Sequence, residues 1–402
     1  ADSWQEVSYK ITANAETAAV KKARIKIQPN TDASTPVYIK DIMVLNNGED
    51  VLASIVGALR IDRIEADVEK FKATAEEVGD LKKHFPEISG LWIARCKEYA
   101  KRIAEASGQT ENFLFFTDPH FGGTTDVNEN TDFFLRKIAA VYNRTPVSMC
   151  VSGGDWLNNY NTKENACWQL GYFDGIMKAL FDKYVMVVGN HDTNYQGFDY
   201  MESGKDGTHN REEYVKCILS TTTQSNLWNR KYGKSYFSFD GDCTKFYVFD
   251  TGIDWYPDMD EYRWEQVDWF ANALLADKPE RGAALMHIAT ASSPMLDAVT
   301  QIASAYNTRA SITLNGITYD FTGVSGKIFF VLAGHTHVDS SYAVNGIPVI
   351  TTINAMVDTS DITFDLVLAD YDADKIHMVR VGSGKVRVIS LATGQLISED
   401  NL

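Results

Sequence analysis

Five short motifs contain five of the eight histidines of this 402-residue chain, together with aspartates and one asparagine. Each motif follows directly on a run of apolar residues with the composition of a β-strand. Imidazole and carboxylate groups suit borderline divalent ions, and one aspartate can bridge two such ions. The residue types therefore predict a site for two transition metals side by side. The motifs are Asp118-Pro119-His120, Gly154-Asp155, Gly189-Asn190-His191-Asp192, Met286-His287 and Gly334-His335-Thr336-His337.

The prediction depends on the whole set, because each motif alone has an ordinary structural explanation. A single histidine such as His287 in an apolar strand is more often structural than a metal ligand. Residues two apart in an extended segment point the same way, so Asp118 with His120, and His335 with His337, can present paired ligands. Five such motifs in one chain, each after a strand, favour the metal site.

Apolar strand candidates alternate with longer helical stretches from about residue 112 onward. Their continuous apolarity predicts strands covered on both faces, which is typical of an α/β core. In open α/β sheets, functional side chains collect beyond the carboxyl ends of the strands, and every motif has that position. The strand candidates are Phe113–Phe116, Val147–Val151, Val185–Val188, Phe246–Phe249, Ala284–Met286, Ile328–Leu332 and Pro348–Thr352.

The order and spelling of the five motifs resemble those of the calcineurin-like metallophosphoesterases, over roughly residues 112 to 390. Gln266–Phe270 and Ile347–Thr351 agree with that family, and the segments Phe364–Leu368 and Lys375–Gly382 resemble the closing β-hairpin of its bacterial members. The resemblance implies an α/β fold with two mixed β-sheets sandwiched between helices. It also implies hydrolysis of a phosphate ester by attack of a metal-bridging hydroxide, with phosphomonoesters, phosphodiesters and nucleotide pyrophosphates all open as substrates.

The resemblance also implies which residues hold the metals. One ion would be held by Asp118, His120 and His337, the second by Asn190, His287 and His335, with Asp155 bridging both. The ions would be divalent transition metals, and Mn, Fe, Zn and Ni are all compatible with this ligand set.

Two further residues of the third motif would take part in the reaction. By the same resemblance, His191 would donate a proton to the leaving oxygen or stabilise the transition state, and Asp192 would orient His191. Asn158, Trp156 and Tyr195 are candidate substrate-binding residues, because they lie beside the motifs. Residues 155–159 lack the arginine of the protein-phosphatase branch of the family, which argues against a phosphoprotein substrate.

The remaining chain divides into two segments ahead of the catalytic domain at residues 111–402. Residues 1–50 alternate in strand fashion and resemble the end of a jelly-roll carbohydrate-binding module, which would imply glycan contact; a small β-cap is the alternative. Residues 51–110 have helical periodicity and are expected to form a connector, or else part of the outer layer of the catalytic domain. The module-like segment also motivates an alternative function, a non-catalytic, surface-displayed binding protein that uses the phosphoesterase domain as a scaffold.

The composition limits the kinds of molecule that the protein is expected to bind. The formal net charge is -16 and no stripe rich in lysine and arginine appears, which argues against a nucleic-acid surface and leaves a small phosphorylated substrate. The longest apolar stretches are too short to span a bilayer. The chain opens with Ala1-Asp2-Ser3, as a mature or trimmed protein would, and with the carbohydrate-module resemblance this predicts an extracytoplasmic or secreted bacterial protein. The five cysteines show no Cys-x-x-Cys spacing.

Overall fold

The computed structural model describes most of the chain from residue 89 onward. The described residues are 45–46, 49–50, 89–120, 127–158, 169, 173, 177, 180–193, 235–252, 260–358, 361–382 and 384–400. The chain separates into two compact units, Ala1–Ile55 and Val56–Leu402. In the first unit, β1 (Leu45–Asn46) pairs antiparallel with β2 (Glu49–Asp50). The other strands expected in residues 1–50, the glycan contact predicted for them and the first helical stretch of 51–110 lie outside the described residues.

A seven-stranded mixed sheet forms one half of the large unit, with the strand order β19-β18-β17-β16-β3-β4-β5. Its parallel part consists of β3, β4 and β5, and β16 joins this part antiparallel to β3. The strands are β3 (Thr110–Phe116), β4 (Met149–Ser152), β5 (Tyr184–Met186), β16 (Phe364–Asp370), β17 (Lys375–Val381), β18 (Val386–Ser390) and β19 (Leu396–Asp400).

A six-stranded mixed sheet forms the other half, in the order β12-β13-β11-β8-β7-β6. Strands β7, β8, β11 and β13 run parallel, with β6 and β12 antiparallel at the edges. The strands are β6 (Phe237–Asp240), β7 (Lys245–Val248), β8 (Arg281–Leu285), β11 (Lys327–Ala333), β12 (Ser340–Val344) and β13 (Ile347–Thr351). Two small hairpins join β9 (Ser311–Leu314) to β10 (Ile317–Asp320) and β14 (Met356–Asp358) to β15 (Asp361–Ile362).

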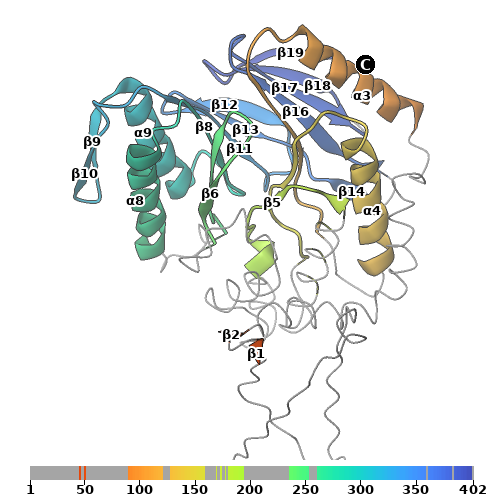
Figure 1. Cartoon of the computed structure of the whole chain (residues 1–402), viewed down its shortest axis with the longest axis horizontal. Helices are drawn as coiled ribbons and strands as arrows, with labels where there is room; N and C mark the ends of the chain where they lie inside the picture. Colours follow the sequence, from red (N-terminus) through yellow and green to blue (C-terminus); the bar gives the residue numbers. More distant parts are fainter. Residues whose placement is uncertain are drawn as a thin grey trace, which may run out of the picture. The chain divides into compact units, whose positions relative to one another are not determined.

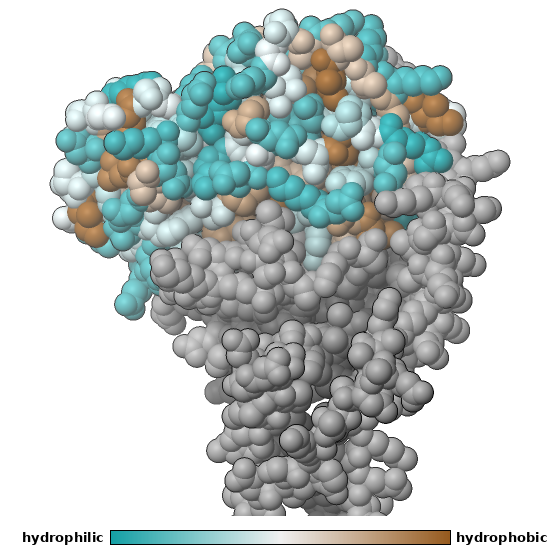
Figure 2. Space-filling view, in the orientation of Figure 1, coloured by the Kyte–Doolittle hydropathy of each residue, from teal (hydrophilic) through white to brown (hydrophobic). Residues whose placement is uncertain are grey.

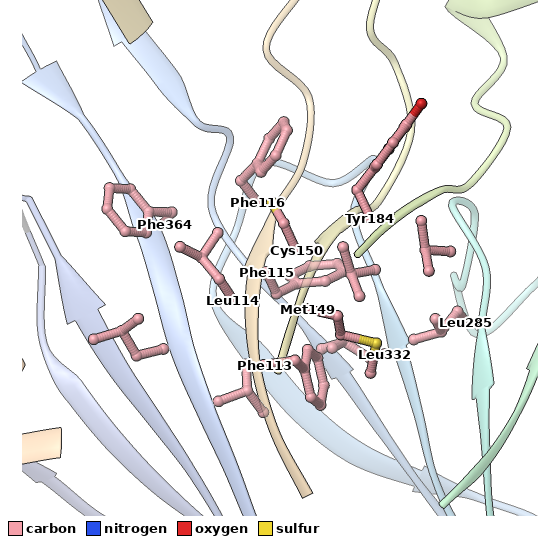
Figure 3. Packing of buried hydrophobic residues seen from close by; sticks show 14 of the residues in the cluster. Phe113, Leu114, Phe115, Phe116, Met149, Cys150, Tyr184, Leu285, Leu332 and Phe364 are labelled. Carbon is pink, nitrogen blue, oxygen red and sulfur yellow. The ribbon is translucent and has the colours of Figure 1, made fainter. Parts of the chain in front are cut away.

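The two sheets face each other and share one apolar core (Figures 1 and 3). Phe113 on β3 packs against Phe246 on β7, with ring centroids 5.7 Å apart. In Figure 3, Phe113 and Met149 from one sheet lie close to Leu285 and Leu332 from the other. The central strands are buried along nearly their whole length because both faces are covered, as their continuous apolarity predicts.

Helices cover the outer faces of both sheets (Figure 1). α4 (Val127–Tyr142) packs Phe134 against Phe116 of β3, and a second apolar cluster joins α8 (Asp260–Asp277) and α9 (Pro294–Thr308) to the six-stranded sheet. α9 begins at Ser293, whose hydroxyl accepts from the Leu296 amide, with Pro294 in the first turn. This architecture confirms the predicted α/β fold of two mixed sheets between helices.

α3 (Gly90–Glu105) falls in the segment expected to be a connector, and it packs on the seven-stranded sheet. The Trp92 ring lies 5.5 Å from the Phe364 ring of β16, and the Tyr99 hydroxyl donates to the Val367 carbonyl. α3 therefore belongs to the outer layer of the large unit. No helix within the described ranges is long and apolar enough to cross a membrane. On the face seen in Figure 2, apolar residues are interspersed with hydrophilic ones.

Candidate metal centre

The five motifs emerge from the carboxyl ends of five strands. Asp118 follows β3, Asp155 follows β4, His191 follows β5, His287 follows β8 and His335 follows β11. Because these strands run parallel within their sheets and the sheets face each other, their carboxyl ends bring the motifs into one place.

The backbone at the motifs adopts an uncommon conformation. Five predicted ligands have a positive φ, between 49° and 69°, namely Asp118, His120, Asp155, His335 and His337. A non-glycine residue in this left-handed region costs on the order of 1 kcal/mol, and such residues cluster at functional sites. Gly189 allows the close approach of two motifs, since a Cβ there would lie 2.1 Å from Oδ1 of Asp155.

One ligand group consists of Asp118, His120 and His337. The Nε2 atom of His337 lies 3.1 Å from Asp118 Oδ1 and 3.0 Å from Nε2 of His120, which is itself 3.8 Å from Asp118 Oδ1. Ligands bound tetrahedrally at metal distances of about 2.0–2.1 Å would be about 3.3 Å apart, so the spacing fits a transition metal. The Thr117 hydroxyl and the His335 amide both donate to Asp118 Oδ2, which leaves Oδ1 facing the imidazoles.

The second ligand group consists of Asp155, His287 and His335. The fully buried His287 has its Nδ1 2.8 Å from the Gly153 carbonyl, so Nδ1 carries a proton and Nε2 is the nitrogen that can bind a cation. That Nε2 lies 3.0 Å from Asp155 Oδ2 and 3.7 Å from Asp118 Oδ1. An imidazole nitrogen that faces two buried carboxylates can hold either a proton or a metal ion between itself and them.

The electrostatics of the cluster agree with cation binding. Burial alone would lower the pKa of His287, but the charges of Asp155 and Asp118 raise it to about 10. A metal ion can take the place of the proton that the two carboxylates otherwise draw onto the ring. The residues present therefore fit a divalent metal.

Asp155 lies between the two ligand groups. It is 1% exposed, and it also forms a third ligand group with His120 and His191. Its Oδ1 accepts from the His191 amide at 2.8 Å, while its Oδ2 faces His287. Asp155 therefore shares a ligand group with a member of each of the other two, namely His120 and His287.

The third motif brings His191 to the rim of the cluster. Its ring centroid is 4.5 Å from that of His120, and its Nε2 is 3.8 Å from Asp155 Oδ2. The side chain is 20% exposed, so it can meet a bound substrate. The preceding Asn190 is buried, and a carboxamide oxygen is an acceptable metal ligand.

Asp192 has partners that differ from the predicted contact with His191. Its carboxylate accepts from four main-chain amides: those of Asp155, Trp156, Leu157 and Gly189. Nδ1 of His191 is buried and has no hydrogen-bond partner among the described residues. The expectation that Asp192 orients the imidazole is therefore corrected, because the carboxylate fastens the Asp155 loop to the His191 loop.

The comparison with protein families identifies the family of this chain. The family model described as calcineurin-like phosphoesterase matches residues 111–339, which is more than half of the chain. The chain belongs to the calcineurin-like phosphoesterases. No curated protein sequence matches this phosphoesterase.

Solved structures similar to this chain are distant from it in sequence. The purple acid phosphatase PPD1 from yellow lupin (Lupinus luteus) is 13% identical with a TM-score of 0.40, over 73% of this chain and 53% of that chain. A putative 5'-nucleotidase from Staphylococcus aureus is 10% identical with a TM-score of 0.36, over 71% and 55%. GAP50, the anchor in the inner membrane complex of Plasmodium, is 11% identical with a TM-score of 0.40, over 73% and 89%. The chain thus spans about half the length of the lupin phosphatase.

The three candidate substrate-binding residues differ in where they lie. Trp156 is 1% exposed and packs edge-on against Phe116 and Phe173, with ring centroids 5.7 and 4.6 Å away, so it is a core residue and not part of a substrate groove. Asn158 is half-buried at the end of the Asp155 loop. Tyr195 lies outside the described residues.

Thr251 contributes to the site although the sequence analysis gave it no role. Its hydroxyl oxygen accepts from the His287 amide at 3.1 Å and from the Ile288 amide at 2.8 Å. The next residue, Gly252, lies close to Gly189. A Cβ added to Gly252 would lie 2.8 Å from the carbonyl oxygen of Gly189. The available signal was that Asp250-Thr251 also follows directly on a strand, β7.

Proposed function

We propose that this phosphoesterase hydrolyses phosphate esters with the aid of two divalent transition metals. The observation that carries the proposal is that Asp155 belongs to two ligand groups, one with His287 and His335 and one with His120 and His191, each with its ligand atoms within 4.8 Å of one another. Asp118, His120 and His337 would hold one ion. Asn190, His287 and His335 would hold the other, with Asp155 between them.

Bound there, two divalent ions would supply an activated water as the nucleophile and positive charge for the phosphoryl oxygens. Mn, Fe, Zn and Ni all suit imidazole and carboxylate ligands, and availability decides among them as much as affinity does. The chain supplies the rigid framework. Its ligands are held by hydrogen bonds such as the one that His287 Nδ1 donates to the Gly153 carbonyl, so little reorganisation is needed when the ions bind.

His191 is the residue best placed to assist the leaving group. Its main-chain amide donates to Asp155, and its ring lies next to that of His120 at the edge of the cluster. The partly exposed ring can donate a proton to the leaving oxygen, a role that contributes about 10²–10⁴-fold to rate in other enzymes. Both a phosphomonoester and a phosphodiester can present such a leaving oxygen.

The test is turnover of Mn-loaded protein on p-nitrophenyl phosphate and bis-p-nitrophenyl phosphate, with metal content measured on the same samples. Asp155→Asn should lose turnover and metal together, since it removes a ligand shared by the two sites. His191→Gln should keep its metal while kcat falls about 10²–10⁴-fold. His377→Gln, which changes a histidine on β17 outside the ligand groups, is the matched control and should keep both.

Either of two results would overturn the proposal. One is full turnover by Asp155→Asn. The other is wild-type protein that binds no divalent ion in calorimetry and hydrolyses neither substrate, which would favour the non-catalytic binding protein instead. Among active outcomes, the preference between the two substrates separates a phosphomonoesterase from a phosphodiesterase.

A further inference from the structure

The loop that carries His335 and His337 ends in an anchored carboxylate, Asp339. Its Oδ1 accepts from the Ile353 amide at 3.1 Å and from the Thr352 hydroxyl at 3.2 Å. The Val338 carbonyl of the same loop accepts from the Thr351 hydroxyl at 2.8 Å. Residues at the end of β13 thus hold the loop two residues beyond the metal ligand His337.

Two arginines from the C-terminal strands complete this anchor. Arg380 on β17 donates to both oxygens of Asp339, at 2.7 and 3.2 Å, and Arg387 on β18 lies 3.1 Å from Oδ1. Both guanidinium groups are buried, with residue exposures of 0% and 2%. A two-oxygen contact between a buried arginine and a carboxylate fixes orientation as well as distance.

The arginines are themselves fixed on the seven-stranded sheet. Arg380 Nε donates to Asp365 Oδ1 on β16 at 2.8 Å, and its Nη2 donates to the Thr352 hydroxyl at 2.7 Å. Arg387 Nη1 donates to the Thr351 carbonyl at 3.0 Å. The network therefore joins β16, β17 and β18 of one sheet to the loop that leaves β11 of the other.

The loop needs such an anchor because few other contacts with described residues hold His337. Both His335 and His337 have a positive φ, and the His337 side chain is 43% exposed. Its imidazole contacts are with Asp118 and His120, which are ligands of the same ion. An exposed ligand on a left-handed backbone keeps its direction only if neighbouring contacts hold it.

We propose that Arg380 and Arg387, acting through Asp339, are positioning residues that hold His337 in the ligand group with Asp118 and His120. The inference rests on the proposed function, since it concerns the affinity of one of the two metal sites. Both arginines lie beyond residue 339, where the family match ends, so the closing strands would complete a site whose ligands all come from the matched region.

The test is a calorimetric titration of metal-free protein with Mn²⁺, together with the melting temperature of the metal-free protein. Asp339→Asn should weaken one of the two binding events about 10–100-fold and leave the other unchanged. Glu98→Gln is the control. Glu98 is also a partly buried partner of an arginine, with 2.8 Å between Glu98 Oε1 and Arg102 Nε, but it lies on α3, away from the His337 loop. The control should change the melting temperature and leave both Mn²⁺ binding events unchanged.

A double-mutant cycle tests whether the arginine acts through Asp339. Arg387→Gln should weaken the same binding event, and the Asp339→Asn, Arg387→Gln double variant should be weakened by less than the product of the two single effects. Two unchanged binding events in Asp339→Asn, with only a lower melting temperature, would overturn the inference and leave the proposed function standing. Wild-type protein that binds none of Mn²⁺, Fe²⁺, Zn²⁺ and Ni²⁺ would overturn both.

Discussion

The Nε2 atoms of His120 and His337 lie 3.0 Å apart, although the two residues are 217 positions apart in the chain. Nε2 of His337 is also 3.1 Å from Asp118 Oδ1. Two imidazole nitrogens and a carboxylate oxygen can converge in this way if a proton or a cation lies among them, since three lone pairs otherwise repel one another. The convergence of these atoms therefore supports the proposed metal site.

Removal of metal should destabilise the protein. The ligand groups are built from residues far apart in sequence, so ions bind the folded chain and have little affinity for the unfolded one. Metal at 100 times its Kd then stabilises the fold by about 2.7 kcal/mol per site. We expect EDTA to lower the melting temperature of Mn-loaded protein by roughly 3–5 °C for each ion lost. Differential scanning fluorimetry measures this, and the same chelator should leave the melting temperature of Asp155→Asn unchanged. Equal melting temperatures of the wild type with and without EDTA would contradict the site.

Replacement of Asp192 by asparagine should cost more stability than a typical Asp→Asn change. The buried carboxylate accepts from four main-chain amides, two on each oxygen. An asparagine would turn an NH₂ group toward two of those donors and leave both buried and unsatisfied, which costs about 2–5 kcal/mol in total. Urea denaturation of the metal-free protein measures the change.

Asp320→Asn is the matched control for Asp192→Asn. Asp320 also accepts a main-chain amide, that of Thr322 at 3.0 Å, but it is exposed, so water can replace the lost bond. We expect a much smaller loss of stability for the control than for Asp192→Asn. Similar losses in the two variants would show that Asp192 does not fasten the two loops.

The part of the structure that the sequence predicted best is the part that local pattern determines. Runs such as Phe113–Phe116 and Ile328–Leu332 are apolar without interruption, which requires a strand covered on both faces, and they lie within β3 and β11. The ligand types at the ends of such strands follow from the chemistry of divalent ions. Both features can be inferred from a few neighbouring residues.

The features that the sequence did not predict depend on contacts between distant residues. Trp156 follows the ligand Asp155 in sequence, but its side chain points into the core, because Phe116 and Phe173 provide an aromatic pocket there. The main-chain partners of Asp192 and the pairing of Asp339 with Arg380 also join separate segments. No local periodicity reports such contacts.

Trp156 should matter for stability and not for substrate affinity. Trp156→Ala would leave a cavity between Phe116 and Phe173 and should cost about 3–5 kcal/mol. Trp156→Phe should cost much less, because it keeps an aromatic ring and removes an indole N–H that is buried without a hydrogen-bond partner among the described residues. Denaturation gives the stabilities, and the KM for p-nitrophenyl phosphate should be unchanged in Trp156→Phe. A several-fold rise in that KM without loss of stability would restore the substrate-binding role.

His377 should make the stability of the protein depend on pH below neutrality. Its Nδ1 lies 2.9 Å from the Arg102 guanidinium, so it accepts a hydrogen bond as a neutral ring. Burial and the charge of Arg102 lower the pKa of His377 to about 4, against the opposing charges of Asp370 and Glu98. Between pH 4 and the ordinary pKa of about 6.5, the unfolded chain therefore binds a proton at this residue that the folded chain does not.

The sign of the effect follows from this difference in proton binding. The free energy of unfolding should rise with pH across the window from about 4 to 6.5, and His377 should contribute no slope above it. His377→Gln, whose carboxamide oxygen can accept from Arg102, should lose this slope, which amounts to at most about 1–2 kcal/mol between pH 6.5 and 5. Denaturation of both metal-free proteins at several pH values measures it, and the titration of the ligand histidines cancels in the difference between them. A wild type and a variant with the same pH dependence would contradict the prediction, because the guanidinium contact would then not hold His377 neutral in the folded protein.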